Sequence, residues 1–378
     1  MIPVDRSHVV IVGGGPAGCA TAVALANLGM TGVVLISPGL PSSFQVGETL
    51  SPDTRGILQQ LGLWDGFVAD QHEPCLGSCS AWGSSVLGYN DFLLSPRGTG
   101  WHIDRNRFED FLFKRACASS VTFRIGRVTD VARDVRFRLT LRDPKRTLQY
   151  LEAEFVVDAS GTSSTVAKRL GARRQVVDKL TFICGHFRHD GTERRSTLTL
   201  LEAAKDGWWY TADLPNGRVI ATLATEAEFA RSLTLHEPHQ WMMLLKQTKH
   251  VARRLHNCTL DPFRLTAKVV APFRLDRVSD ERWLAVGDAA AAYDPISSQG
   301  IEKALDSARH AAEAVARAIA SGTALSPDYG RRIIQTFDEY RANRDYFYAI
   351  ERRWAEAPFW RNRRARSISP VTASLGIP

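Results

Sequence analysis

The sequence predicts a mixed α/β fold in which a parallel-sheet domain is interleaved with an antiparallel-sheet domain and followed by a helical segment. A β-branched run at residues 8–12 precedes a glycine-rich turn and an alanine-rich helix, the order typical of a parallel strand–turn–helix unit. Alternating polar and apolar residues at 121–151, and further strand-like runs at 180–225, favour antiparallel strands. Helical patterns dominate residues 301–320 and 327–366.

The first glycine-rich turn has the spacing of a dinucleotide-binding motif. Gly13, Gly15 and Gly18 fill the positions of G-x-G-x-x-G, and Pro16 and Ala17 lie between them where the helix opens. The first glycine permits a tight turn, the second lets a pyrophosphate approach the backbone, and the third lets helix and strand pack closely. Phosphates would then bind the free N–H groups at the helix N-terminus. We therefore predict a Rossmann-like domain here rather than a ligand-free turn.

The second strand of this unit, expected at residues 33–36, lacks its usual acidic successor. A Glu or Asp at this position normally accepts hydrogen bonds from a ribose. The residue here is Ser37, whose hydroxyl can hydrogen-bond a ribose without charge. We expect a weaker ribose contact or a contact from another residue.

The remaining elements follow in order along the chain. We expect an amphipathic helix at 103–117, a strand at 155–157, a helix at 164–170, a turn at 215–217, a helix at 236–256, a strand at 283–286 and a helix at 301–320. No internal repeat or low-complexity linker is visible, so we expect the two domains to interleave. The predicted parallel-sheet domain comprises residues 1–70, 100–175 and 272–325, the substrate-binding domain 71–99 and 176–271, and the C-terminal helical segment 326–378.

Composition is ordinary for a globular protein, with 44% hydrophobic and 23% charged residues among 378. No stretch is long and apolar enough to predict a membrane span. The N-terminus lacks the basic region of a signal peptide, and its apolar run contains the motif glycines. Six scattered cysteines favour free thiols in a reducing compartment, so we expect a cytoplasmic protein.

No metal site is predicted. Cys75 and Cys79 are close in sequence but have no second pair. His236 and His239 are separated by a proline and lack a third ligand at suitable spacing.

The C-terminal segment combines arginines with aromatic residues, and the chain has a net charge of +8. Such a tail could bind nucleic acid or an acidic surface. Alternatively, a helix could dock its aromatic side chains on the body and leave its arginines in water. We favour docking and expect no nucleic-acid partner, because no nucleic-acid-binding fold is predicted elsewhere.

Three short motifs in a fixed order carry a family resemblance. They are residues 13–18, Asp158-Ala159-Ser160-Gly161 and Gly287-Asp288-Ala289-Ala290. Together they resemble the FAD-binding frame of the para-hydroxybenzoate-hydroxylase-like flavin monooxygenases and of the flavin halogenases. The resemblance extends over most of the chain and implies an FAD-dependent oxidoreductase.

The resemblance also implies which residues contact the cofactor. Asp288 would contact the ribityl–pyrophosphate part, Arg105 the flavin, and the helix beginning near Gly300 would point at the pyrimidine side of the ring. A helix N-terminus stabilises the negative charge of reduced flavin by its partial positive charge. The full predicted set is Gly13, Gly15, Pro16, Ala17, Gly18, Ser37, Glu48, Arg105, Asp158, Gly161, Asp288, Pro295, Gly300 and Ile301.

Halogenation is not expected. The halogenases pass hypohalous acid through a lysine in the first hundred residues, whereas the first lysine here is Lys114. Their Trp-x-Trp-x-Ile-Pro motif is missing, and Ser297 takes the position of their catalytic Glu.

A narrower resemblance involves residues 46–52, 82–84, 100–105 and 294–300. These segments resemble a halogenase-related subgroup that includes the flavoproteins of tryptophylquinone cofactor biogenesis. The subgroup implies an FAD-dependent monooxygenase that hydroxylates an aromatic ring through a flavin hydroperoxide, with a tryptophan of a partner polypeptide as one substrate. Oxygen would be the co-substrate, and NADH, NADPH or a separate reductase the electron source. A small-molecule FAD hydroxylase or reductase, and a non-catalytic flavin-binding maturation factor, remain alternatives.

The catalytic candidates are few. Glu48 could accept a substrate proton if burial raised its pKa, or it could instead cap the helix beginning near Pro52. Ser297 and Ser298 belong to the loop before the last helix of the cofactor domain. His102 and Asp91 are weaker candidates.

Overall fold

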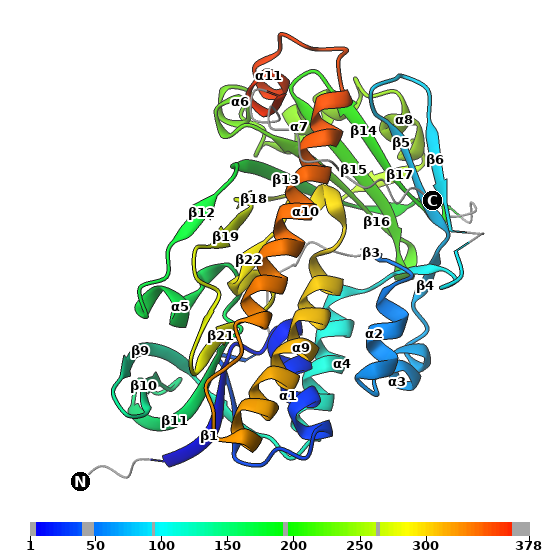
Figure 1. Ribbon diagram of the computed structural model, residues 1–378. Coiled ribbons are helices and arrows are strands. Elements are labelled where there is room, and N and C mark those ends of the chain that lie inside the picture. Colours follow the sequence, from blue (N-terminus) through cyan, green and yellow to red (C-terminus); the bar gives the residue numbers. More distant parts are fainter. Residues whose placement is uncertain (1–4, 40–48, 93–94, 192–195, 262–264, 365–378) are drawn as a thin grey trace.

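The computed structural model describes residues 5–39, 49–92, 95–191, 196–261 and 265–364 (Figure 1). Within these ranges the strands form two eight-stranded sheets and two three-stranded sheets. Glu48 lies outside the described residues. No helix within these ranges combines the length and the apolar content that a bilayer-spanning segment requires.

The first large sheet has a parallel centre. Its order is β20-β21-β11-β1-β2-β8, and the pairs from β21 to β8 are all parallel. The strands are β1 (Asp5–Val12), β2 (Val33–Ser37), β8 (Thr122–Ile125), β11 (Leu148–Asp158), β20 (Ser279–Asp280) and β21 (Trp283–Ala285). The β-branched residues of β1 and β2 are buried, as strands covered on both faces require. The predicted Rossmann-like domain is confirmed.

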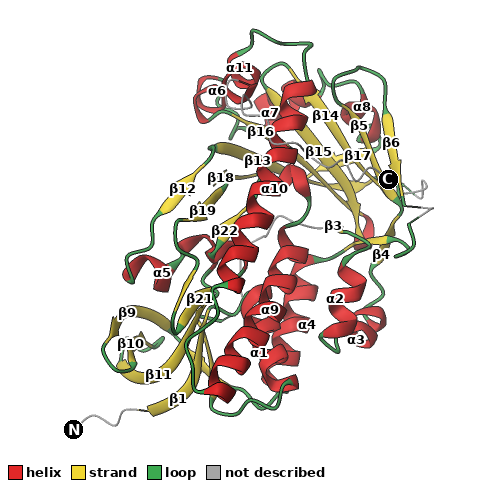
Figure 2. Ribbon diagram, in the orientation of Figure 1, coloured by secondary structure: helices red, strands yellow, loops and turns green. Residues whose placement is uncertain are grey.

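Three helices cover one face of this sheet (Figure 2). α1 (Pro16–Asn27) contacts both α4 (Arg105–Cys117) and α9 (Gly300–Ser321). Alanine and glycine dominate the buried side of α1, so these helices can approach one another closely. α9 ends at Gly322 in the left-handed conformation, as a helix C-terminus favours.

The second large sheet is mostly antiparallel. Its order is β17-β13-β16-β15-β14-β5-β6, with β18 also paired to β13. The strands are β5 (Gly77–Ala81), β6 (Gly88–Asp91), β13 (Leu180–His189), β14 (Leu198–Ala204), β15 (Gly207–Leu214), β16 (Arg218–Thr225), β17 (Cys258–Leu260) and β18 (Thr266–Val270). Strands from residues 77–91 therefore share a sheet with strands that are a hundred residues further along the chain.

The smaller elements connect these layers. They are β3 (Thr49–Leu50), α2 (Thr54–Gln60), α3 (Trp64–Ala69), β4 (Glu73–Cys75), β7 (Gly100–His102), β9 (Arg127–Arg133), β10 (Phe137–Arg142), α5 (Thr165–Arg169), β12 (Arg174–Val176), α6 (Ala227–Ser232), β19 (Phe273–Leu275) and β22 (Ala291–Ala292). Single 3-10 turns occur at Gly161–Ser163, Pro215–Gly217, Gly287–Ala289 and Pro295–Ser297.

Two expectations about these elements were wrong. The single helix predicted at 236–256 is two helices, α7 (Pro238–Leu245) and α8 (His250–Arg254). The Glu202 carboxylate accepts the backbone N–H groups of residues 249–251 at 2.7–2.8 Å, so α8 has its own N-terminal cap and begins anew. In addition, β8 pairs in parallel with β2 and does not belong to the β9–β10–β11 meander.

The C-terminal helices pack against both large sheets. α10 (Asp328–Ile350) runs from the β21 end of the molecule to the second sheet, where α11 (Pro358–Arg364) follows (Figure 1). Trp360 of α11 is fully buried, and its indole N–H donates to Ala204 O at 2.9 Å. Contrary to the expectation of solvated arginines, Arg363 is buried and pairs with Asp178 and Glu226.

Candidate active site

One large cavity joins the two domains. Its volume is about 1060 Å³, at the upper end of the range for small-molecule sites. It begins at the carboxyl ends of β1 and β2, where ligands bind in open α/β sheets. It ends against β13, β15 and β16 of the second sheet.

The glycine turn at the start of the cavity is shaped by backbone contacts. Gly13 has φ +120°, and a Cβ there would lie 2.2 Å from Ala159 O. A Cβ on Gly18 would lie 1.8 Å from Gly13 O, so helix and strand could not pack as they do. Gly15 is different, because a Cβ there would meet no atom within 4 Å. Gly15 is also the N-cap of α1 and makes no side-chain cap, so the first N–H groups of α1 are available to an anion.

Ser37 lies at the end of β2, on the cavity wall. Its hydroxyl lies 3.1 and 3.3 Å from the backbone O and N of Gly39. A Cβ on Gly14 would lie 2.6 Å from the Ser37 side chain. This serine thus packs under the glycine turn and shapes the loop that follows β2.

Asp158 does not line the cavity, contrary to the cofactor contact expected for it. It is fully buried, and its carboxylate accepts hydrogen bonds from Ser160 N at 3.0 Å and Ala167 N at 2.8 Å. Burial raises its pKa, and these bonds oppose that shift. The cavity wall here is formed instead by the next residues, including Gly161 at φ +61°.

Arg105 lines the cavity from the start of α4. Its Nε donates to Glu109 Oε1 at 2.6 Å, one helical turn later. Glu109 is buried and also lines the cavity. The ion pair therefore holds the Arg105 side chain in one direction beside the cavity. Nothing in the sequence indicated that Glu109 would have this role.

The loop before α9 forms the far side of the cavity. Pro295, Ser298, Gly300 and Ile301 line it, and Ser298 has φ +51°. Ser297 does not line it, and its hydroxyl donates to Asp294 O at 3.1 Å within the turn. Of the two serine candidates, only Ser298 is brought to the cavity.

Asp288 lines the cavity and has a partner that sequence reasoning missed. Lys303 Nζ donates to Asp288 Oδ1 at 2.7 Å and lies 4.2 Å from the centre of the Tyr293 ring. Burial raises the pKa of Tyr293, so this phenol stays neutral. Lys303 thus balances the charge of Asp288 beside the cavity.

The second sheet supplies an aromatic wall. Phe182, Trp208, Tyr210 and Thr222 line the cavity from β13, β15 and β16. Trp208 and Tyr210 are two residues apart on β15 and so share one face, whereas Trp209 packs on the other face against Trp241. In the sequence, this wall is indicated only by the two-residue spacing of Trp208 and Tyr210, which puts both on one face of a strand.

A chain of polar groups leads from the cavity to a buried histidine. Tyr210 Oη lies 2.9 Å from Thr49 Oγ1, which lies 3.3 Å from His102 Nδ1. Thr49 and His102 are paired across β3 and β7. Burial, reinforced by the charge of Arg254, lowers the pKa of His102 to about 4, so the ring is neutral at pH 7.

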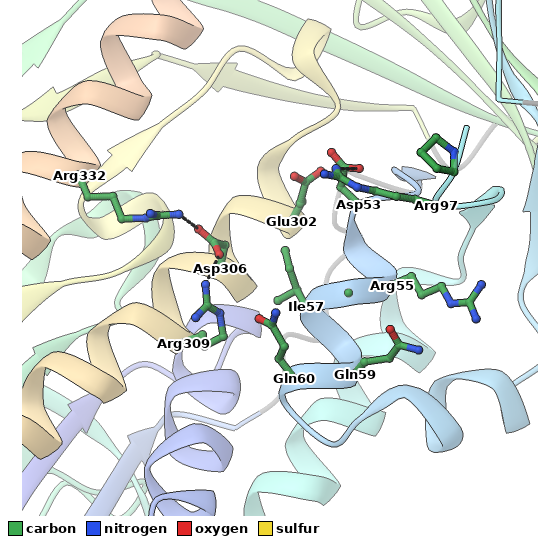
Figure 3. A pocket seen from close by; sticks show the side chains of 12 residues that line it. Asp53, Arg55, Ile57, Gln59, Gln60, Arg97, Glu302, Asp306, Arg309 and Arg332 are labelled. Carbon is green, nitrogen blue, oxygen red and sulfur yellow. Dashed lines mark hydrogen bonds and ion pairs between the residues drawn. The ribbon is translucent and has the colours of Figure 1, made fainter. Parts of the chain in front are cut away.

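A second pocket of about 780 Å³ lies between α2 and α9, and its lining is polar (Figure 3). Asp306 pairs there with Arg309 and Arg332 at 3.1 and 3.2 Å, so its negative charge is compensated within the pocket. Glu302, on the first turn of α9, accepts a hydrogen bond from Ser51. Burial raises the pKa of Glu302.

The cysteines have the environment of structural thiols. Burial raises the pKa of Cys19 to about 12, and it also raises the pKa of Cys75 and of Cys79. Within the described ranges, no three His, Cys, Asp or Glu side chains are grouped as a metal ion would require.

These features fit a bound FAD. The open space at Gly15 and the uncapped start of α1 suit a pyrophosphate, and the cavity continues far enough to place a ring system near the N-terminus of α9. Fold and site together define an FAD-dependent oxidoreductase. A family model described as an FAD binding domain matches residues 6–341, so the chain belongs to this family.

Similar proteins agree with this assignment. LodB of Marinomonas mediterranea, whose name assigns it provisionally to the FAD-dependent oxidoreductases, is 27% identical over 369 residues, covering 96% of this chain and 98% of LodB. The flavin-dependent halogenase CmlS superposes with TM-score 0.82 at 24% identity, over 96% of this chain and 68% of CmlS. The peptidyl tryptophan dihydroxylase QhpG superposes with TM-score 0.68 at 23% identity, over 95% of this chain and 79% of QhpG. The predicted membership of the flavin monooxygenase and halogenase superfamily is confirmed.

Gly15→Val should abolish FAD binding without unfolding the protein. The added side chain enters open space and so strains nothing, but it occupies the approach of the pyrophosphate. The measurement is the FAD content of the purified protein together with its thermal unfolding. Gly56→Val is the control, because a Cβ there also meets no atom within 4 Å and Gly56 lies outside the large cavity. Stoichiometric FAD in the Gly15 variant would contradict the site.

His102→Gln should reduce the loss of stability in acid. The folded-state pKa of about 4 lies below the ordinary value of 6.5, so the unfolded chain binds a proton first as the pH falls. Stability from this residue is complete above pH 6.5 and falls toward pH 4, by about 3 kcal/mol for a shift of this size. Urea unfolding at pH 7 and pH 4.5 measures the difference. The exposed His236→Gln is the control, and an equal acid dependence in the two variants would contradict the prediction.

Proposed function

We propose that the protein is an FAD-dependent monooxygenase that hydroxylates an aromatic ring, and that a tryptophan side chain of a partner polypeptide is its substrate class. The observation that supports this best is the aromatic wall of Phe182, Trp208 and Tyr210, which shares one cavity with the loop at the N-terminus of α9. An aromatic ring can stack on such a wall. The fold shared with QhpG, which acts on peptidyl tryptophan, is consistent with the proposal.

Bound FAD supplies the redox chemistry with oxygen, after reduction by NADH, NADPH or a separate reductase. The residues of the chain supply position and electrostatics. The N-terminus of α9 at Gly300 and Ile301 offers partial positive charge to the ring of the cofactor. Arg105, held by its ion pair with Glu109, adds guanidinium N–H groups in a fixed direction beside the cavity. Phe182 and Trp208, both buried, exclude water from the reacting end.

Tyr210 is the described group best placed to exchange a proton with the substrate. Its hydroxyl faces Thr49, and Thr49 faces the neutral ring of His102. These hydrogen bonds orient the Tyr210 hydroxyl, and the low pKa of His102, about 4, keeps the ring neutral at pH 7, so the chain positions Tyr210 and does not store a proton. Residues 71–99 and 176–271 then act as the substrate-binding domain, and residues 1–70, 100–175 and 272–325 hold the cofactor.

The positions of the lysines favour hydroxylation over halogenation, because no described lysine matches the halogenase lysine. The first lysine of the chain is Lys114, on the exposed side of α4 and paired with Asp110. Lys303 is committed to Asp288. Lys268 lines the cavity from β18, but it is exposed and belongs to a segment far from the position of the halogenase lysine.

The decisive test is mass spectrometry of candidate substrates incubated with the FAD-loaded protein, a reductant and oxygen. Free tryptophan, phenols and tryptophan-containing peptides are compared, with bromide and chloride present. We expect a gain of one or two oxygen atoms on a peptide and no halogenated product. Halogenation that requires reduced flavin would overturn the proposal. Oxygen on free small molecules alone would favour a small-molecule hydroxylase, and no product from any aromatic would favour a maturation factor.

Gly300→Asp should make the bound flavin harder to reduce. A Cβ at Gly300 meets no atom within 4 Å, so the change fits the fold, and the residue lines the cavity. A carboxylate there would repel the negative charge of a reduced flavin ring near the N-terminus of α9. The midpoint potential, measured by dye-coupled reduction, should fall, whereas the neutral Gly300→Asn should change it little. Equal potentials in the two FAD-loaded variants would show that α9 does not face the ring.

A further inference from the structure

The C-terminal helices contribute a buried charged cluster directly behind the cavity wall. Arg344 of α10 and Arg363 of α11 meet Asp178 and Asp294, and all four side chains are buried. Arg344 also pairs with Asp345 at 3.0 Å, and Arg363 with Glu226 at 2.7 Å. Buried ion pairs of this kind add little net stability compared with apolar packing, but they are costly to break. The cluster therefore fixes how α10 and α11 lie against Asp178 and Asp294 more than it adds to the free energy of unfolding.

Asp294 is the member of the cluster that reaches the cavity. It lines the cavity and directly precedes the loop 295–300. Its carboxylate accepts hydrogen bonds from Tyr348 Oη at 2.9 Å, Arg344 Nε at 3.3 Å and Ile296 N at 3.1 Å. Its backbone N–H donates to Tyr340 Oη at 2.6 Å. Two tyrosines of α10 thus fix both the side chain and the backbone of Asp294.

Tyr348 also contacts the opposite wall of the cavity. Its hydroxyl accepts the indole N–H of Trp208 at 3.0 Å while it donates to Asp294. Burial raises the pKa of Tyr348 well above its ordinary value, so the hydroxyl keeps the proton it donates. Complete burial likewise raises the pKa of Asp294, and each hydrogen bond to the carboxylate helps to keep it ionised. Tyr348 is therefore the bridge between the aromatic wall and the loop before α9.

We propose that Tyr348 is a positioning residue of the active site, which sets Trp208 and the loop 294–300 at a fixed separation around the flavin ring. The proposal rests on the flavin placement of the proposed function but not on the identity of the substrate. Without this hydroxyl, the Asp294 carboxylate loses a donor and the indole N–H of Trp208 loses its acceptor. The wall and the loop are then free to shift, and the charge of Asp294 is less well balanced beside the ring.

Sulfite is the probe. Its sulfur lone pair forms a bond to N5 of oxidised flavin, and the ring electrons that this bond displaces place negative charge at N1 and O2. Its affinity measures how well the protein stabilises that charge and requires no substrate. In FAD-loaded Tyr348→Phe we expect the sulfite Kd to rise by about fivefold or more, the effect of one lost buried hydrogen bond. FAD content and thermal unfolding are measured on the same samples.

Tyr329→Phe is the matched control. Tyr329 is also a buried tyrosine of α10, and its hydroxyl donates to Ala285 O at 2.6 Å, away from the loop 294–300. A purely structural role predicts that both variants lose thermal stability and keep the same sulfite Kd. Unchanged or tighter sulfite binding in Tyr348→Phe, or equal weakening in Tyr329→Phe, would overturn the proposal.

Tyr340→Phe provides a second test if Tyr348→Phe yields little folded protein. It removes the acceptor of the Asp294 N–H and leaves the carboxylate contacts in place. The sulfite Kd should again rise relative to the Tyr329 control, and an unchanged value would overturn the positioning role of α10. Failure to find an oxygenated product would leave these results intact, so the two proposals fail separately.

Discussion

The site depends on a backbone contact that only glycine allows. Gly13 and Gly18 face one another and Ala159 so closely that any Cβ would collide with a carbonyl oxygen. This contact places the N-terminus of α1 between the carboxyl ends of β1 and β11, where its free N–H groups form an anion site. The cavity begins at this arrangement, because the glycine turn and the start of α1 form its first wall. Gly15, the one motif glycine with open space around it, is the position left for the ligand.

The cofactor half of the fold was predictable because its determinants are local. The strand, the turn and the helix at residues 8–28 follow each other directly. Their hydrophobic patterns indicate the secondary structure, and the glycine spacing indicates a dinucleotide ligand. The same local reasoning missed what depends on distant partners. The cap that Glu202 provides for α8 comes from another strand, and the ionic partner of Asp288 is a lysine fifteen residues later. Local reasoning also missed that the Asp158 carboxylate is hydrogen-bonded by the turn and the helix that follow it.

The substrate half was less predictable because its wall is assembled from pairings between remote strands. Phe182, Trp208 and Tyr210 line one cavity with Thr49, and Tyr210 hydrogen-bonds Thr49, only because strands remote in sequence come together in the folded chain. Alternation within β15 indicates that Trp208 and Tyr210 share a face, but not which cavity that face adjoins. Glu48, the acid–base candidate of the sequence, lies outside the described residues. Its role stays a prediction. Among the described residues, a polar chain from Tyr210 through Thr49 to His102 adjoins the cavity.

The division between these halves explains why proteins of this fold differ in chemistry. Residues that bind the cofactor must fit the pyrophosphate and the dipole of α9, so few substitutions are compatible with cofactor binding at these positions. The wall opposite them comes from other strands and can differ between proteins of one fold, so function belongs to the site and not to the fold. In this chain, that wall is connected to the cofactor side through Tyr348, which donates to Asp294 and accepts from Trp208. Under the positioning role that we propose for Tyr348, a change in the aromatic wall would reach the loop before α9 through α10.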